Sequence, residues 1–179
     1  MSIQSWVVRF ANTPTGEGDW DLPRGRWLFM RRLPQLVHAP LSLTEKQWDR
    51  LAWNLAFYGA GPLWNAHEPI ESRLELLDSL AALVIRCRER SAEGAGGVFM
   101  YWDVLVQQLL IDPPMRAGLF EALTRQLALP DRDLQLSALH GLNHLLDART
   151  PEFVRRISAN LADDEVRAFA EAAATFSMP

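Results

Sequence analysis

From residue 42 to the end of the chain, apolar side chains recur with the period of an α-helix. In the segment SLTEKQWDRLAWNLAFYG, Trp48, Leu51, Ala52 and Leu55 stand at positions i, i+3, i+4 and i+7, which places them on one helix face. No segment of this region alternates apolar and polar residues with period two, which is the pattern of a half-buried strand. The pattern therefore predicts an all-α fold.

Capping residues indicate where these helices begin and end. Ser42 and Glu45 have the spacing of a capping box, so a helix is expected to begin there and to end near Gly59. A second helix is expected over 70–90, followed by a flexible connection at 91–97 (SAEGAGG). Shorter helices are then expected over 98–111, 114–129, 131–147, 151–162 and 164–176, with Thr150 and Asp163 as N-caps.

The spacing of these helices indicates stacked helical hairpins. Two helices with their turns occupy about 33 residues, close to the period of helical-hairpin repeats. We therefore expect one domain over 1–179, in which a hairpin at 42–90 and the helices at 98–176 stack as a short antiparallel α-solenoid. Residues 1–41 contain the loop-like run ANTPTGEGDWDLPRG and are expected to form an irregular, Trp-rich N-terminal cap, with any helix there interrupted at Pro34.

Composition and charge narrow the function classes. The formal net charge of -4 leaves no basic footprint for nucleic acid. No apolar run approaches the roughly 18 residues that span a bilayer, and the N-terminus lacks the pattern of a secretory signal, so we expect no membrane association and a cytoplasmic location. The single cysteine, Cys87, excludes an internal disulfide and falls in an apolar helical stripe, where a buried structural thiol is expected.

Charge and tryptophan are both unevenly distributed. Residues 1–90 hold 11 Lys+Arg and 10 Asp+Glu, a net charge of +1, whereas residues 91–179 hold 7 and 12, a net charge of -5. Six of the seven tryptophans lie within the first 64 residues, and several of them stand close to arginines. Tryptophan and arginine are enriched in protein interfaces, but tryptophans at this end could equally close the helical stack as a cap.

The segment SALHGLNHLL contains two histidines four residues apart. On a helical wheel of residues 131–147, the leucines form the core side, and Asp133, His140, His144 and Asp147 cluster on the opposite side. Histidines at i and i+4 present their imidazoles on one face, as zinc-binding helices do. However, no third strong ligand stands at a familiar spacing.

Three interpretations of this polar face stay open. The histidines could bind a metal, with a carboxylate of the same helix as ligand or as hydrogen-bond partner. They could pack against a neighbouring helix, because a glycine inside a helix (Gly141) costs about 1 kcal/mol relative to alanine and is easier to explain if another backbone approaches near Ser137 and Gly141. They could also form a docking face for a partner protein.

The segment DLQLSALHGLNHLL is similar to a segment of bacterial HEAT-like helical-repeat proteins, in which a Ser-Ala-Leu-His-Gly-Leu-Gly-His run opens a repeat helix. Asn143 stands here in place of the second glycine. The upstream segment FMYWDVLVQQLL, with Trp102 and Asp103, resembles the preceding helix of that family. The resemblance covers residues 98–176 and implies a superhelix of paired helices without known catalysis.

The resemblance implies a non-catalytic protein-binding module without a cofactor. Some small proteins of this kind resemble bacterial immunity proteins, which neutralise toxins delivered by contact-dependent or type VI secretion, and we expect the same function here. Such a protein would occlude the toxin's active site. We expect Asp133, His140, His144 and Asp147 to be its partner-binding residues, and the acidic C-terminal half would suit a basic cleft in the toxin. The alternative is a metal-binding protein or metal-dependent enzyme centred on His140 and His144.

Overall fold

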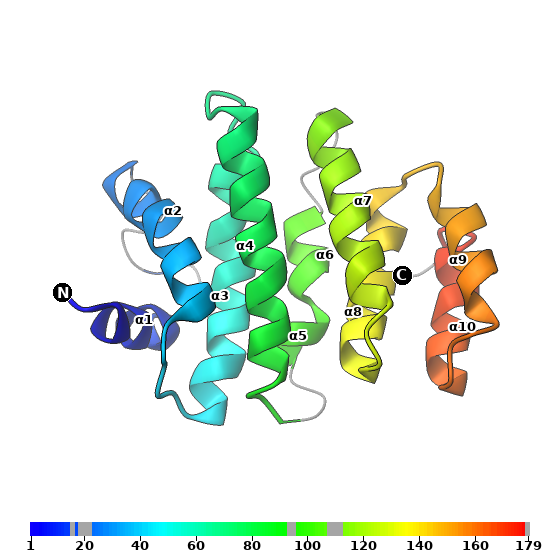
Figure 1. The fold of residues 1–179 in the computed structure, drawn as a ribbon, viewed down its shortest axis with the longest axis horizontal. Helices are drawn as coiled ribbons and strands as arrows, with labels where there is room; N and C mark the ends of the chain where they lie inside the picture. Colours follow the sequence, from blue (N-terminus) through cyan, green and yellow to red (C-terminus); the bar gives the residue numbers. More distant parts are fainter. Residues whose placement is uncertain (15–16, 18–22, 93–95, 107–112, 178–179) are drawn as a thin grey trace.

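The computed structural model describes residues 1–14, 17, 23–92, 96–106 and 113–177, and every regular element among them is a helix (Figure 1). The helices are α1 (Ile3–Asn12), α2 (Pro23–His38), α3 (Glu45–Leu63), α4 (Ile70–Arg88), α5 (Gly96–Phe99), α6 (Tyr101–Val106), α7 (Pro113–Leu127), α8 (Arg132–Leu145), α9 (Thr150–Ser158) and α10 (Asp164–Ala173). The all-α prediction is therefore confirmed for the described residues. Among these residues, no helix has both the length and the apolar character needed to cross a bilayer.

The helices lie in two layers along an elongated molecule (Figure 1). One layer contains α2, α4, α7 and α9, and the other contains α1, α3, α5, α6, α8 and α10. Helices that follow each other pack across the layers, as α3 does with α4 and α7 with α8, and helices within a layer pack side by side, as α6 does with α8. Neighbouring helices thus pack against each other, and the arrangement as an antiparallel HEAT-like solenoid stays a prediction.

The prediction that residues 1–41 are irregular is wrong for much of the described part, because α1 and α2 lie there. Ser2 caps α1 by accepting a hydrogen bond from the backbone N–H of Ser5. The side chains of Trp6 and Phe10, one helical turn apart, are fully buried and stack with their ring centroids 5.1 Å apart. The helix α2 continues through Pro34 instead of being interrupted there.

The capping box of α3 lies two residues later than the sequence predicted. Thr44 Oγ1 accepts a hydrogen bond from the backbone N–H of Gln47, and Gln47 Oε1 accepts one from the backbone N–H of Thr44. Ser42 instead bonds through its backbone to the side-chain amide of Gln4, which ties α1 to the start of α3. Gly59 does not end α3, because the helix continues to Leu63.

Arg86 of α4 fixes the C-terminal end of α2. Its guanidinium donates hydrogen bonds to the backbone carbonyls of Leu36, Val37 and Ala39, which have no helical N–H partner at this end. The same guanidinium lies over the ring of Trp48, which is buried as predicted. The helix α2 is therefore held in a fixed position against α4.

Leu146 ends α8 in the left-handed conformation, with φ 50° and ψ 35°, and its side chain is 62% exposed. This conformation costs a residue with a Cβ about 1–2 kcal/mol, whereas glycine adopts it freely. We therefore expect Leu146→Gly to raise the free energy of unfolding by about 0.5–1 kcal/mol, because little packing is lost. Urea denaturation measures the change. If the Leu146→Gly variant is less stable than wild type, the backbone of Leu146 is not strained. In the control Leu145→Gly, a buried side chain is lost and the stability should fall.

Candidate metal centre

The helices α6 and α8 approach each other closely at Gly141. A Cβ on Gly141 would lie 2.7 Å from Trp102 Cβ and 2.8 Å from Leu123 Cδ2, which is closer than carbon atoms pack. Nearby, Ser137 Oγ donates a hydrogen bond of 2.8 Å to the backbone carbonyl of Val98. The close approach of a neighbouring helix, which one of the three interpretations required, is therefore present at Ser137 and Gly141.

Buried hydrogen bonds hold α6 in this position. The fully buried Trp102 donates from Nε1 to Gln126 Oε1 at 2.8 Å, and Gln126 Nε2 donates to the backbone carbonyl of Leu134 at 2.9 Å. On the other side, the hydroxyl of Tyr101 donates to the backbone carbonyl of Leu80 at 3.0 Å. These hydrogen bonds hold α6 against α4, α7 and α8. They therefore also fix the position of Asp103, the residue that follows Trp102 in α6.

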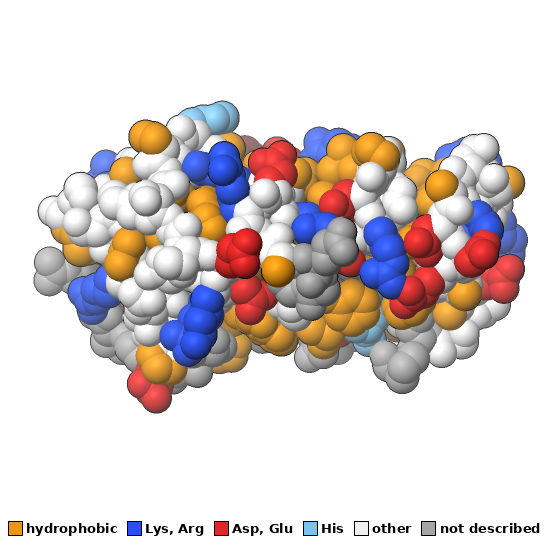
Figure 2. Space-filling model, turned by 90° about the horizontal axis from the view of Figure 1, so that it is seen from below, with side chains coloured by type: hydrophobic (Ala, Val, Ile, Leu, Met, Phe, Trp, Pro, Cys, Tyr) orange, Lys and Arg blue, Asp and Glu red, His pale blue; other side chains and the backbone are white. Residues whose placement is uncertain are grey.

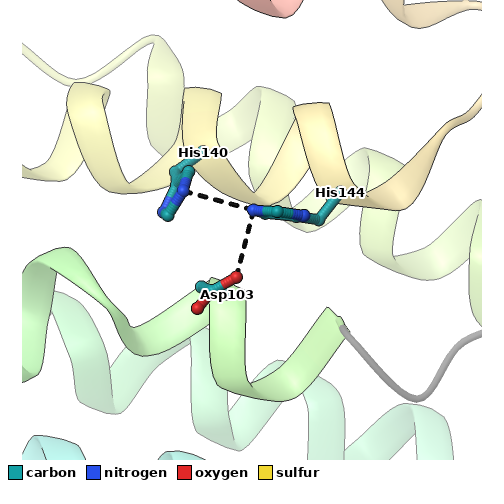
Figure 3. Close-up of side chains that lie close together, drawn as sticks. All are labelled: Asp103, His140 and His144. Carbon is teal, nitrogen blue, oxygen red and sulfur yellow. Dashed lines mark hydrogen bonds and ion pairs between the residues drawn. The ribbon is translucent and has the colours of Figure 1, made fainter. Parts of the chain in front are cut away.

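This packing brings Asp103 next to the two histidines of α8 (Figure 3). His144 Nε2 lies 3.1 Å from Asp103 Oδ1 and 3.2 Å from His140 Nε2. One ligand atom from each of the three side chains lies within 4.8 Å of the other two. Asp103 and His140 are buried, whereas the side chain of His144 is 26% exposed. The cluster is thus mostly enclosed but reachable from solvent at His144.

A single proton does not satisfy both close contacts of His144 Nε2. If this nitrogen carries a hydrogen, the hydrogen points well at either Asp103 or His140, but not at both. If it carries none, its lone pair faces the Asp103 carboxylate, which is an acceptor when ionised. A cation between the three atoms would accept all three lone pairs at once.

Two of the three distances among these atoms are close to the distances between ligand atoms in a metal site. Tetrahedral zinc with ligand bonds of about 2.0–2.1 Å separates neighbouring ligand atoms by roughly 3.3–3.4 Å. The observed separations of 3.1 and 3.2 Å are close to that edge length. Three protein ligands leave a fourth position for water or another ligand.

Aromatic side chains fix the orientation of His140. The ring of Phe99 stacks on the imidazole, with centroids 5.4 Å apart and planes 19° apart. Phe169 of α10 meets Phe99 edge to face at 6.3 Å. His140 therefore presents its Nε2 to His144 from an apolar wall, which lowers the local dielectric and strengthens charge interactions there.

The structure separates Asp133 and Asp147 from the histidines with which they shared a face on the helical wheel. Asp133 forms ion pairs with Arg88 of α4 at 3.3 Å and with Arg132 at 3.2 Å. Asp147 lies beyond the end of α8 and pairs with Arg149. Both aspartates are buried, and each carboxylate is paired with an arginine of the chain.

The partner-binding role predicted for Asp133, His140, His144 and Asp147 stays a prediction. Because the other three are buried, a partner that docked there would reach chiefly His144. The C-terminal half does not present a single acidic patch on the face in Figure 2, where acidic and basic side chains are interspersed over the C-terminal helices.

The third member of the cluster, Asp103, was missed by sequence reasoning. It comes from a different helix, and no spacing within α8 reveals it. The signal that could have found it was the segment FMYWD, which also carries the resemblance to HEAT-like proteins. Cys87, in contrast, is fully buried as predicted, and burial raises the pKa of its thiol well above the usual range.

The Asp147–Arg149 pair makes a pH-dependent contribution to stability. Asp147 accepts hydrogen bonds from the Arg149 guanidinium at 2.8 and 2.9 Å and from the Arg149 backbone N–H, and these bonds lower the pKa of the carboxyl group. A carboxyl whose pKa is lowered by folding stabilises the fold above its unfolded pKa of about 3.9, and this stabilisation is lost as the pH falls through the folded pKa.

We therefore expect Asp147→Asn to lower the free energy of unfolding by about 1–2 kcal/mol at neutral pH. The difference from wild type should shrink once the pH falls below about 4. Urea denaturation across this pH range measures it. An equal loss at every pH would show that the charge of Asp147 does not stabilise the fold.

Comparisons of the chain with known protein families, with curated proteins and with solved structures gave no match.

Proposed function

We propose that this chain binds one divalent transition-metal ion through Asp103, His140 and His144. The observation that carries the proposal is that one ligand atom from each of three side chains, on two adjacent helices, lies within 4.8 Å of the other two. The proposal reverses the order of the two hypotheses from the sequence, in which protein binding came first. It takes support from Gly141, since the close helix contact at this glycine brings Asp103 to the histidines.

The ligand types favour a transition metal over magnesium or calcium. Mg²⁺ and Ca²⁺ prefer shells of oxygen ligands, whereas imidazole nitrogens suit zinc, iron, nickel and copper. Two histidines and one carboxylate on adjacent helices are a donor set for zinc or for iron(II) with open coordination positions. A bound ion could therefore hold and polarise a water molecule at the partly exposed side of the cluster, next to His144.

Metal binding is tested by calorimetric titration of the metal-free chain with Zn²⁺ and, separately, with Mg²⁺. We expect one Zn²⁺ per chain and no comparable binding of Mg²⁺. At free zinc about 100 times the Kd, the fold should gain about 2.7 kcal/mol, or roughly 5–10 °C in Tm. Asp103→Asn and His144→Gln remove one ligand each with little change in size, so each should weaken zinc binding at least about 100-fold and abolish the zinc-dependent rise in Tm.

Exposed histidines elsewhere in the chain provide the matched control. His67→Gln makes the same chemical change as His144→Gln outside the cluster and should leave zinc binding unchanged. Circular dichroism of each metal-free variant separates lost binding from lost folding. Zinc binding that is equally tight in His144→Gln, Asp103→Asn and wild type would overturn the proposal, as would the absence of stoichiometric binding to the folded wild-type chain.

A further inference from the structure

The helix α2 presents a basic surface at the N-terminal end of the molecule. Its sequence, PRGRWLFMRRLPQLVH, contains four arginines and no aspartate or glutamate. The side chains of Phe29, Leu33 and Leu36 are buried and attach α2 to the rest of the fold. The arginines of α2 therefore belong to a helix whose apolar face is already packed against the rest of the fold.

An exposed tryptophan lies among these arginines. The side chain of Trp27 is 57% exposed, and the Arg31 guanidinium lies over its ring, 4.7 Å from the centroid. Arg32 donates hydrogen bonds to Gln35 Oε1 at 3.1 Å and to the backbone carbonyl of Met1 at 3.3 Å. These contacts of Arg31 and Arg32 are with neutral groups, which orient the guanidinium groups without neutralising them.

Trp27 stands between two hollows of the surface. The larger, of about 610 Å³, lies between α2 and α4, and its apolar lining includes Met30 and Leu76. Glu68 and Glu75 form part of its opposite wall. The smaller, of about 250 Å³, lies along α2 on the side of Leu28, Arg32 and Gln35. A partner could therefore seat a side chain on either side of the tryptophan ring.

We propose that Trp27, Arg31 and Arg32 form a docking surface for an acidic segment of a partner protein. Tryptophan and arginine are the residues that most often dominate the energy of protein interfaces. The planar guanidinium group matches a carboxylate with two parallel hydrogen bonds. A carboxylate of the partner would pair with Arg31 or Arg32, while a neighbouring apolar side chain fills the hollow beside Trp27.

The charges around the larger hollow favour a protein segment over nucleic acid or an anionic membrane. Glu68 and Glu75 lie across the hollow from the arginines, so a ligand with continuous negative charge would be repelled from one wall. A peptide can place a carboxylate at α2 and an apolar or basic side chain at α4. The docking surface shares no residue with the candidate metal centre of Asp103, His140 and His144.

The test selects peptides from a random phage-displayed library on the immobilised full-length chain and titrates the synthetic peptides by fluorescence anisotropy. We expect the selected peptides to be enriched in Asp and Glu next to an apolar residue. Their affinity should fall at least tenfold for Trp27→Ala and for the double variant Arg31→Glu with Arg32→Glu, and it should weaken as salt is added. Peptides in which lysine replaces the acidic residues should bind that double variant better than wild type.

The matched control is the double variant Arg155→Glu with Arg156→Glu, which reverses two adjacent exposed arginines on α9 and should leave binding unchanged. The proposal would be overturned if the selected peptides were not enriched in Asp and Glu, or if their affinity fell equally for both double variants. Tighter binding of phosphatidylserine vesicles or duplex DNA to the same residues would also overturn it. So would concentration-dependent self-association that Trp27→Ala abolishes, because the occupant would then be a second copy of the chain.

Discussion

Gly141→Ala is expected to lower the free energy of unfolding by about 2 kcal/mol, although alanine favours a helix interior by about 1 kcal/mol. The added methyl group would lie 2.7 Å from Trp102 Cβ and 2.8 Å from Leu123 Cδ2. Trp102 Cβ is bonded to the backbone of α6, and its ring is held by Gln126, so the clash is relieved only if α6 and α8 move apart. Urea denaturation measures the loss.

The same substitution at Gly61 is the matched control. Gly61 also lies in a helix, but a Cβ there would meet no atom within 4 Å other than those of its chain neighbours and of the helix's own backbone. We expect Gly61→Ala to change the free energy of unfolding by less than about 1 kcal/mol, because the better helix propensity of alanine is opposed by Pro62, which disfavours helical backbone in a preceding residue that has a Cβ. Because separation of α6 from α8 moves Asp103 away from the histidines, Gly141→Ala should also weaken zinc binding, whereas Gly61→Ala should not. If Gly141→Ala is as stable as Gly61→Ala, the close contact does not exist in solution.

Trp102→Ala should have the largest effect on stability, a loss of about 3–5 kcal/mol. The side chain is fully buried, contacts Tyr101 edge to face at 5.4 Å and donates to Gln126 Oε1. The substitution removes a large apolar volume and leaves the Gln126 oxygen without that donor. Thermal and urea denaturation measure the change.

Two other variants distinguish packing from hydrogen bonding at this position. Trp102→Phe keeps most of the apolar ring but loses the indole N–H, and we expect it to cost about half as much as Trp102→Ala. Trp27→Ala deletes the same side chain at an exposed position and should change stability by less than about 0.5 kcal/mol. If Trp102→Ala lowers the free energy of unfolding by less than about 1 kcal/mol, the side chain of Trp102 does not hold α6 in place.

Local patterns predicted much of the helical fold. The helices after residue 42 bury apolar residues, and the N-cap at Asp163 lies where the sequence placed it. The prediction of Thr150 as an N-cap is wrong, because Thr150 is the first residue of α9 and Arg149 occupies the N-cap position. The helices of residues 1–41 were missed because the loop-like run between them and the proline inside α2 are local signals against helix. Tertiary packing overrides them, through the burial of Trp6 and Phe10 and the capping of α2 by Arg86.

The candidate site could be predicted only in part. The i, i+4 spacing of His140 and His144 and the cost of a glycine inside a helix were both visible in one segment. The structure shows the close helix contact at the glycine, whereas the role of the two histidines stays a prediction. The partners of Asp133 and Asp147 were not visible, since Arg88 comes from another helix and Arg149 from the turn after α8. Asp103 was missed for the same reason, because contacts between helices depend on how the chain stacks.

The central claim, that three side chains from α6 and α8 hold one metal ion, is tested most directly by diffraction from zinc-loaded crystals at the zinc absorption edge. The account predicts one anomalous peak at about 2.0–2.2 Å from the nearest side-chain atoms of Asp103, His140 and His144. A zinc peak at other residues, or an empty cluster in crystals grown with excess zinc, would contradict it.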